Sequence, residues 1–255
     1  MFEHVIFASY GNDSIALIQW SHERDLTGVA VAYSDTGWAA PWWPDRVEQA
    51  EGWVRSIGFT PVRLESEGMA ELVRRKKAWP RGGGGRFQFC TQSLKKEPAE
   101  RWLSDVDPEC EATCLVGVRR EESANRRQWP EWTEESPAHG GRTLWAPLVR
   151  HSERERDELI AKTPMQLLPF RSKECWPCVN ARMGEIALLE EETITRIESL
   201  EAEMGTNSNG NARVMFSPKR HGGAVGIRAV VDRCNGGTED MFGSTMGCDS
   251  GFCGD

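Results

Sequence analysis

The chain has 255 residues, of which 27% are charged, and a formal net charge of −8. This length suffices for one α/β domain with a full core and a small appendage. The acidic balance disfavours a non-specific nucleic-acid binder, which needs clustered Lys and Arg. No apolar run approaches the roughly 20 residues that span a bilayer, and the first residues lack the basic and apolar regions of a signal peptide. We therefore expect a cytoplasmic protein without a membrane partner.

The first half of the chain alternates strand-like and helix-like segments. Helical spacing or composition predicts helices at 15–21, 45–57 and 97–105, the first with Asp13 or Ser14 near its N-cap. Apolar or β-branched runs predict strands at residues 4–8, 27–33, 60–64 and 112–118. This alternation predicts an α/β fold with a doubly wound, mostly parallel sheet and helices on both faces.

The second half of the chain is mostly helical and ends in a polar, glycine-rich segment. Ser152 and Glu155 form a capping box that predicts a helix to about residue 162, and residues 183–204 predict the longest helix. The four glycines within 80–86 predict a surface loop, and the polar stretch 206–211 predicts a linker. We therefore expect a main domain at 1–205 and a small Gly- and Cys-rich C-terminal extension at 206–255.

Residues 9–14, Ser-Tyr-Gly-Asn-Asp-Ser, join the first predicted strand to the first predicted helix. Such a loop can bind an anion, because backbone N–H groups and the helix dipole point at the ligand. Ser9 and Ser14 add hydroxyl groups, Gly11 lets the backbone come close, and Asp13 can help to hold a Mg²⁺ ion between phosphates. Short polar loops also connect strands to helices without binding anything, so the loop alone leaves both interpretations open.

Eight cysteines are many for a chain expected in a reducing compartment, where such clusters more often bind metal or do redox chemistry than form disulfides. A CxxC pair at 175–178 and a second pair in the tail satisfy either a tetrahedral zinc site or a [4Fe-4S] cluster. The alternatives are a redox pair or buried thiols. The candidate ligands are Cys175, Cys178, Cys248 and Cys253, with Cys90 and Cys234 as rivals.

Five segments follow one another in a recognisable order. They are the loop at 9–14, Ser-Asp-Thr-Gly at 34–37, Phe-Cys-Thr-Gln-Ser-Leu-Lys-Lys-Glu-Pro at 89–98, Leu-Val-Gly-Val-Arg-Arg-Glu-Glu-Ser at 115–123, and Trp-Ala-Pro-Leu at 145–148 before the CxxC pair. Over residues 4–190 this order resembles the PP-loop superfamily (adenine nucleotide α-hydrolase-like, or HUP), in its phosphoadenosine phosphosulfate (PAPS) reductase-like branch. Tyr10 and Asn12 depart from its Ser-Gly-Gly-x-Asp-Ser loop, so Tyr10 must tolerate the loop backbone or turn outward.

The resemblance implies a nucleotide-binding main domain with the ligand at the carboxyl ends of the strands. Asp13, Lys95 and Arg119 would be the catalytic residues, because charge stabilisation dominates phosphoryl and nucleotidyl transfer. The branch includes members with a cluster near the nucleotide, which favours iron over zinc and makes Cys90 a plausible ligand. The phosphates and metal would be held by Ser9, Gly11, Asn12, Asp13 and Ser14, and the adenosine or its sugar would lie near Asp35, Thr36 and Gly37.

Three functions fit these observations. The first is an ATP pyrophosphatase-type enzyme that binds Mg–ATP and adenylates an acceptor, for example in sulfur transfer to a nucleic acid or a small molecule, and Asp13 favours it. The second is a sulfonucleotide reductase that reduces adenosine phosphosulfate (APS) or PAPS to sulfite with a cysteine nucleophile. The Cys-Thr-x-x-Leu-Lys segment favours this second function, but the Glu-Cys-Gly-x-His tail of those reductases is missing.

The third function is a non-catalytic nucleotide-binding subunit whose partner does the chemistry. Eleven tryptophans suggest it, because exposed Trp38, Trp42 and Trp43 would form a partner or base-stacking surface. The alternative is that these rings close the nucleotide pocket. The acceptor, and any sulfur donor or redox partner protein, are not identified by the sequence.

Overall fold

The computed structural model describes residues 2–82 and 87–236. Within this part of the chain the strands form one sheet in the order β3-β2-β1-β4-β6-β5, with β5 antiparallel to β6 and the other pairs parallel. The strands are β1 (His4–Phe7), β2 (Val29–Ser34), β3 (Thr60–Leu64), β4 (Thr113–Leu115), β5 (Trp132–Thr133) and β6 (Leu144–Trp145).

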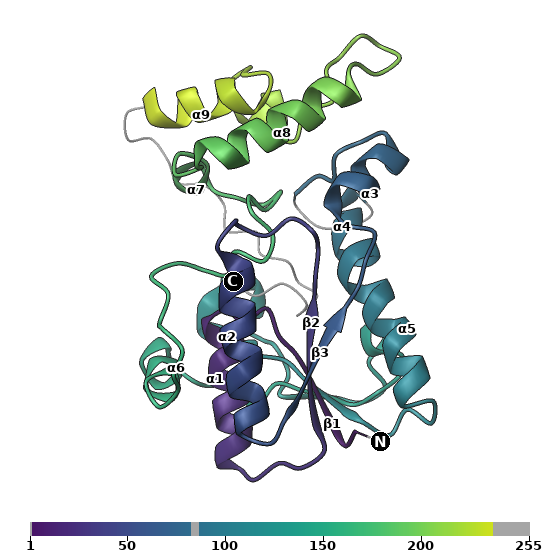
Figure 1. Ribbon diagram of the computed structural model, residues 1–255, viewed down its shortest axis with the longest axis vertical. Helices are drawn as coiled ribbons and strands as arrows, with labels where there is room; N and C mark the ends of the chain where they lie inside the picture. Colours follow the sequence, from purple (N-terminus) through teal and green to yellow (C-terminus); the bar gives the residue numbers. More distant parts are fainter. Residues whose placement is uncertain (1, 83–86, 237–255) are drawn as a thin grey trace.

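Helices cover both faces of this sheet (Figure 1), with α1, α2 and α6 on one side and α5 on the other. The helices α7, α8 and α9 lie beyond one end of the sheet. The expected doubly wound α/β fold is confirmed. The helices are α1 (Asn12–Glu23), α2 (Trp43–Ser56), α3 (Met69–Lys76), α4 (Phe89–Thr91), α5 (Glu97–Val106), α6 (Glu153–Ile160), α7 (Met183–Ile186), α8 (Glu191–Met204) and α9 (Ile227–Gly236). Residues Gln92–Lys96 form a π-helical turn, and 3₁₀ turns occupy Arg120–Glu122, Ala124–Arg126, Pro137–His139 and Pro218–Arg220.

Each face of the sheet packs into its own hydrophobic cluster. Ile6 and Ala8 pack into the cluster beneath α1 and α2, whereas Val5 and Phe7 pack into the cluster beneath α5. Successive side chains of a strand point to opposite faces, so a strand covered on both sides is apolar at every position. Because the core occupies both faces, the polar residues that follow the strands gather at one edge of the sheet.

Three predicted boundaries are wrong. Helix α1 begins at Asn12 with Gly11 as its N-cap, so Asp13 lies inside the first turn. The strand predicted at 112–118 is limited to β4. The single helix predicted at 183–204 is two helices, α7 and α8, because the helix is interrupted before Glu190. Glu190 is the N-cap residue of α8, and its carboxylate accepts a hydrogen bond from the Trp176 indole at 3.0 Å.

The first part of the C-terminal extension packs against the rest of the chain. Thr206 and Ala212 form a β-bridge across the predicted linker, and Ile227 and Val230 of α9 join the same hydrophobic cluster as Ile197 of α8. The boundary between 205 and 206 remains a prediction. The tail from 237, including Cys248 and Cys253, and most of the 80–86 loop lie outside the described residues. In the part that is described, no helix combines the length and apolarity needed to cross a bilayer.

We predict that Glu201 ties the extension to α8. Its carboxylate accepts the backbone N–H groups of Met215 and Ile227, both at 2.8 Å. Glu201→Ala leaves two donors unsatisfied and should lower the free energy of unfolding by about 2–3 kcal/mol in a urea titration. The matched control is Glu198→Ala, whose carboxylate pairs with exposed Arg228 and whose loss should change little. Equal effects of the two changes would contradict this assignment.

Candidate functional site

The backbone of the loop at 9–14 turns sharply at Tyr10. Tyr10 has a left-handed φ of 58°, which costs a non-glycine residue about 1–3 kcal/mol. The side chain turns into the core, where it is fully buried and stacks on Tyr33 with 5.6 Å between ring centroids. Arg46 donates from Nε to the Tyr10 carbonyl oxygen at 2.8 Å. Burial of the ring and this bond together hold the loop in its strained form, and burial raises the pKa of the Tyr10 hydroxyl.

The two serine hydroxyls of the loop bond within the loop itself. The Gly11 N–H donates to Ser9 Oγ at 3.2 Å, and Ser14 Oγ donates to the Gly11 carbonyl oxygen at 3.1 Å. Both side chains are buried. These hydrogen bonds shape the loop, and contact of either serine hydroxyl with a phosphate stays a prediction.

A segment far along the chain lies over the loop. The Asn12 amide donates to the Leu168 carbonyl oxygen at 2.8 Å and accepts the Leu168 N–H at 3.0 Å. A Cβ placed on Gly11 would lie 2.8 Å from the Cβ of Ser172. Gly11 is therefore required by the approach of residues 168–172, whether or not a ligand is bound.

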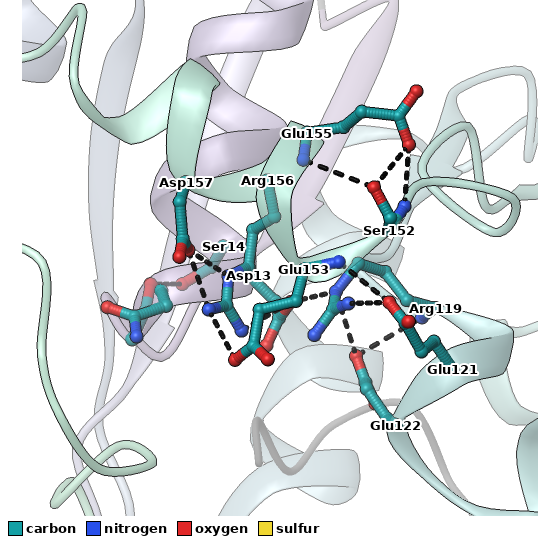
Figure 2. Close-up of polar contacts among 12 residues, drawn as sticks. Asp13, Ser14, Arg119, Glu121, Glu122, Ser152, Glu153, Glu155, Arg156 and Asp157 are labelled. Atoms are coloured by element: carbon teal, nitrogen blue, oxygen red, sulfur yellow. Dashed lines mark hydrogen bonds and ion pairs between the residues drawn. The ribbon is translucent and has the colours of Figure 1, made fainter.

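Asp13 and Arg119 form a buried ion pair beside the loop (Figure 2). The distance from Arg119 Nε to Asp13 Oδ1 is 2.6 Å, and Arg156 Nη1 of α6 lies 3.9 Å from the same oxygen. Glu121 and Glu122 flank Arg119 at 3.5 and 3.8 Å. Motif reasoning predicted Asp13 and Arg119 but missed Arg156. The available signal was the Ser152 capping box, which is present and fixes the start of α6.

These side chains line one cavity, which we call the loop cavity. Its wall carries four arginines and six carboxylates, so its formal charge is −2. The side chains of Asp13, Arg119, Glu122 and Arg156 are buried, where charges interact more strongly than in water, whereas those of Glu121 and Glu153 are exposed. The charged residues are Asp13, Arg119, Glu121, Glu122, Glu153, Arg156, Asp157, Arg171, Arg182 and Glu185.

A second cavity, the thiol cavity, adjoins the first. Lys95 and Glu174 form a buried ion pair in its wall, and Thr36 Oγ1 donates to the Glu174 carbonyl oxygen at 2.8 Å. Sequence reasoning missed Glu174, for which the only signal was its position directly before the CxxC pair. The thiol cavity is also lined by Cys90, Cys175 and Cys178, and it shares Arg171, Asn180 and Glu185 with the loop cavity.

The two CxxC thiols differ in pKa. A hydrogen bond with Cys175 lowers the pKa of Cys178 to about 7, and the pKa of Cys175 is raised by the same bond and by burial. Among residues 2–82 and 87–236, no three His, Cys, Asp or Glu side chains are grouped closely enough for a metal ion. Cys90 lines the same cavity, whereas Cys234 lies in the hydrophobic core on α9.

The segment after β2 is partly buried. Asp35 is exposed and accepts the Gly37 N–H at 2.9 Å, whereas Thr36 is buried. Trp38 and Trp43 are almost fully buried. The expected exposed tryptophan surface is therefore wrong for these two rings, because they fill the core around α2. Trp42, the third member, is 38% exposed.

Gly117 lets the end of β4 approach the loop. A Cβ at this position would lie 2.9 Å from the Asp13 carbonyl oxygen, which is backbone and cannot move aside alone. Gly117→Ala should lower the free energy of unfolding by about 1–3 kcal/mol, because the first turn of α1 must shift. Gly52→Ala is the control: nothing lies within 4 Å of its Cβ, and a helical alanine should stabilise by up to about 1 kcal/mol. An unchanged free energy of unfolding for the Gly117 variant in a urea titration would contradict the prediction.

Comparison with known proteins gives one family. Among solved structures, the PAPS reductase from Candida auris, in a phosphate complex, matches with 16% identity and a TM-score of 0.43, covering 64% of this chain and 73% of that one. No curated protein sequence matches. The family model of the phosphoadenosine phosphosulfate reductase domain matches residues 3–183, which is more than half of the chain. The protein therefore belongs to the PAPS reductase family.

Proposed function

We propose that the protein binds ATP with Mg²⁺ at the loop cavity and cleaves it at the α-phosphate to adenylate an acceptor. The supporting observation is the formal charge of −2 on the cavity wall. A polyphosphate entering this cavity alone meets Coulomb repulsion from the excess of carboxylates. A divalent cation bound with the nucleotide reduces this repulsion, and oxygen ligands such as Asp13 are those that Mg²⁺ takes.

Asp13 and Arg119 exchange partners in this proposal. When bound, Mg²⁺ neutralises charge on the phosphate oxygens and on the leaving pyrophosphate. Asp13 would hold the ion, and Arg119 then turns its guanidinium to the phosphate oxygens, where charge-assisted hydrogen bonds are strong. Arg156, already 3.9 Å from Asp13, keeps a positive charge beside the carboxylate.

We assign the adenosine to the loop cavity on its side toward Thr36, because the loop cavity has a volume of about 690 Å³, the thiol cavity only about 40 Å³, and the two share three residues. Three thiols in the wall of the thiol cavity favour an acceptor reaction in sulfur transfer, to a nucleic acid or a small molecule. Lys95, held by Glu174, supplies positive charge on the thiol side of the nucleotide. A sulfur donor or redox partner protein would restore the thiols after each turnover.

We predict that ATP binding depends on Mg²⁺. In calorimetry, removal of the ion with a chelator should weaken ATP binding by about tenfold or more, a change of about 1.4 kcal/mol. Asp13→Asn should abolish most of this dependence. Asp45→Asn, an exposed aspartate in the first turn of α2, should leave it intact. ATP binding that ignores Mg²⁺ in the wild-type protein would overturn the proposal.

A sulfonucleotide reductase is the second candidate. Membership of the PAPS reductase family supports a function of this type, and Cys90, Cys175 and Cys178 offer thiols beside the nucleotide site. Sulfite released from APS or PAPS in the presence of a dithiol, without AMP formation from Mg–ATP, would favour this candidate. Nucleotide binding without turnover of any of the three would favour the non-catalytic subunit instead.

We further propose that the thiols hold a [4Fe-4S] cluster, with zinc as the alternative. Thiolate sulfur is the donor that both groups take, and Cys90, Cys175 and Cys178 line one cavity. These side chains are not grouped closely enough for a metal ion in the described part of the chain, so cluster binding would require them to draw together. The fourth would come from Cys248 or Cys253, outside the described residues. When bound, a cluster supplies a redox or electrostatic centre beside the nucleotide.

Protein purified without oxygen should contain about four irons and four sulfides per chain and absorb broadly near 400 nm. Cys178→Ser should lose most of the iron, because it removes one ligand. Cys110→Ser, at an exposed cysteine away from the cavity, should lose none. One zinc per chain would select the alternative, and full iron content in the Cys178 variant would exclude this ligand set.

A further inference from the structure

Arg46 of α2 carries a buried positive charge whose hydrogen bonds go to backbone carbonyl groups. The residue is 7% exposed, and its Nε and Nη1 atoms donate to the carbonyl oxygens of Tyr10 and Gln166 at 2.8 and 3.1 Å. Among the residues that the structure describes, no carboxylate pairs with this guanidinium, and its Nη2 atom has no hydrogen-bond partner. Burial lowers the pKa of Arg46 to about 10, so the group stays charged at neutral pH. A buried charge without a counter-ion is unfavourable, and an anion bound nearby offsets that cost.

The two carbonyl groups that Arg46 holds belong to two separate segments beside the loop cavity. Tyr10 precedes the first turn of α1, and Gln166 precedes the stretch 167–171, and side chains of both following stretches line this cavity. One guanidinium therefore ties the loop at 9–14 to the segment that lies over it. Loss of these two bonds would loosen both borders of the cavity together.

The bond from Arg46 also fixes the direction of the peptide group between Tyr10 and Gly11. The C=O and N–H groups of a trans peptide point in opposite directions. With the carbonyl held by Arg46, the Gly11 N–H points to the other side, where it donates to Ser9 Oγ at 3.2 Å. The left-handed φ of 58° at Tyr10 strains this part of the loop, and a glycine at the same position would relieve that strain. A loop with Tyr10 therefore needs an anchor, and Arg46 supplies it.

We infer that Arg46 positions the phosphates of the bound nucleotide, because it holds the loop at 9–14 in one conformation and places an unbalanced positive charge behind it. This inference rests on the proposed function, which puts the phosphates beside this loop. A phosphate group there supplies the negative charge that Arg46 lacks, and the N-terminal end of the α1 dipole acts in the same direction. Arg46 acts through the Tyr10 backbone and lines neither cavity, so it is a positioning residue and not a catalytic one.

The test compares Mg–ATP with adenosine, which lacks the triphosphate, in calorimetric titrations of the full chain. Arg46→Gln keeps a donor and removes the charge, so it should lower the ratio of ATP affinity to adenosine affinity by about tenfold or more. Adenosine binding should change by about threefold or less, because adenosine carries no charge. Arg46→Lys keeps the charge and one donor, and should hold the ratio within about threefold of the wild-type value.

Arg213→Gln is the matched control. Arg213 also holds two backbone carbonyl oxygens, those of Met204 and Thr206, but it lies in the C-terminal extension and lines neither cavity. This change should lower the free energy of unfolding in a urea titration and leave the affinity ratio unchanged. A purely structural role of Arg46 would give the same pattern, with lower stability and an unchanged ratio.

A folded Arg46→Gln variant with the wild-type ratio would overturn the inference. So would an Arg46→Lys variant whose ratio falls by tenfold, the drop expected of Arg46→Gln, and this second variant decides if the first does not fold. Equal affinities for Mg–ATP and adenosine in the wild-type protein overturn it without any variant. Mg²⁺-dependent ATP binding with a ratio that Arg46→Gln leaves unchanged removes this inference and keeps the proposed function, whereas a wild-type protein that binds neither ligand loses both.

Discussion

The buried ion pair between Asp13 and Arg119 joins the two halves of the site. Asp13 comes from the first turn of α1 and Arg119 from the chain that leaves β4, and their atoms lie 2.6 Å apart. The pair can form only because Gly117 has no side chain where Asp13 passes. Two neighbouring parallel strands thus deliver opposite charges to one edge of the sheet, which is where doubly wound folds bind ligands.

Two adjoining cavities of different character lie beside this ion pair. The loop cavity is rich in charge with an excess of carboxylates, whereas the thiol cavity is neutral, with each charged group matched. Residues 168–172 lie over the loop at 9–14, and the chain then runs on to the CxxC pair, so one short stretch borders both cavities. The two cavities meet at Arg171, Asn180 and Glu185.

The sequence was enough to predict four of the six described strands, because β1 and β2 are apolar and the neighbouring helices have clear spacing. It did not predict β5 and β6, which are two residues long and show no apolar run of strand length. It was enough to predict Asp13, Lys95 and Arg119 as charged residues near one edge, although their roles remain to be tested. It could not predict that Glu174 neutralises Lys95, since that contact joins positions 79 residues apart. Nor could it predict the break before α8, where a tertiary bond from Trp176 to Glu190 competes with local helix propensity.

Hydrogen–deuterium exchange with and without Mg–ATP tests the central claim most directly, because it reports where the nucleotide binds without assuming a reaction. The account predicts slower exchange at residues 9–16, at 117–122 and at 168–180, which border the two cavities, and no change in α8 and α9. Protection that spares the loop at 9–14, or that appears only in α8 and α9, would contradict it.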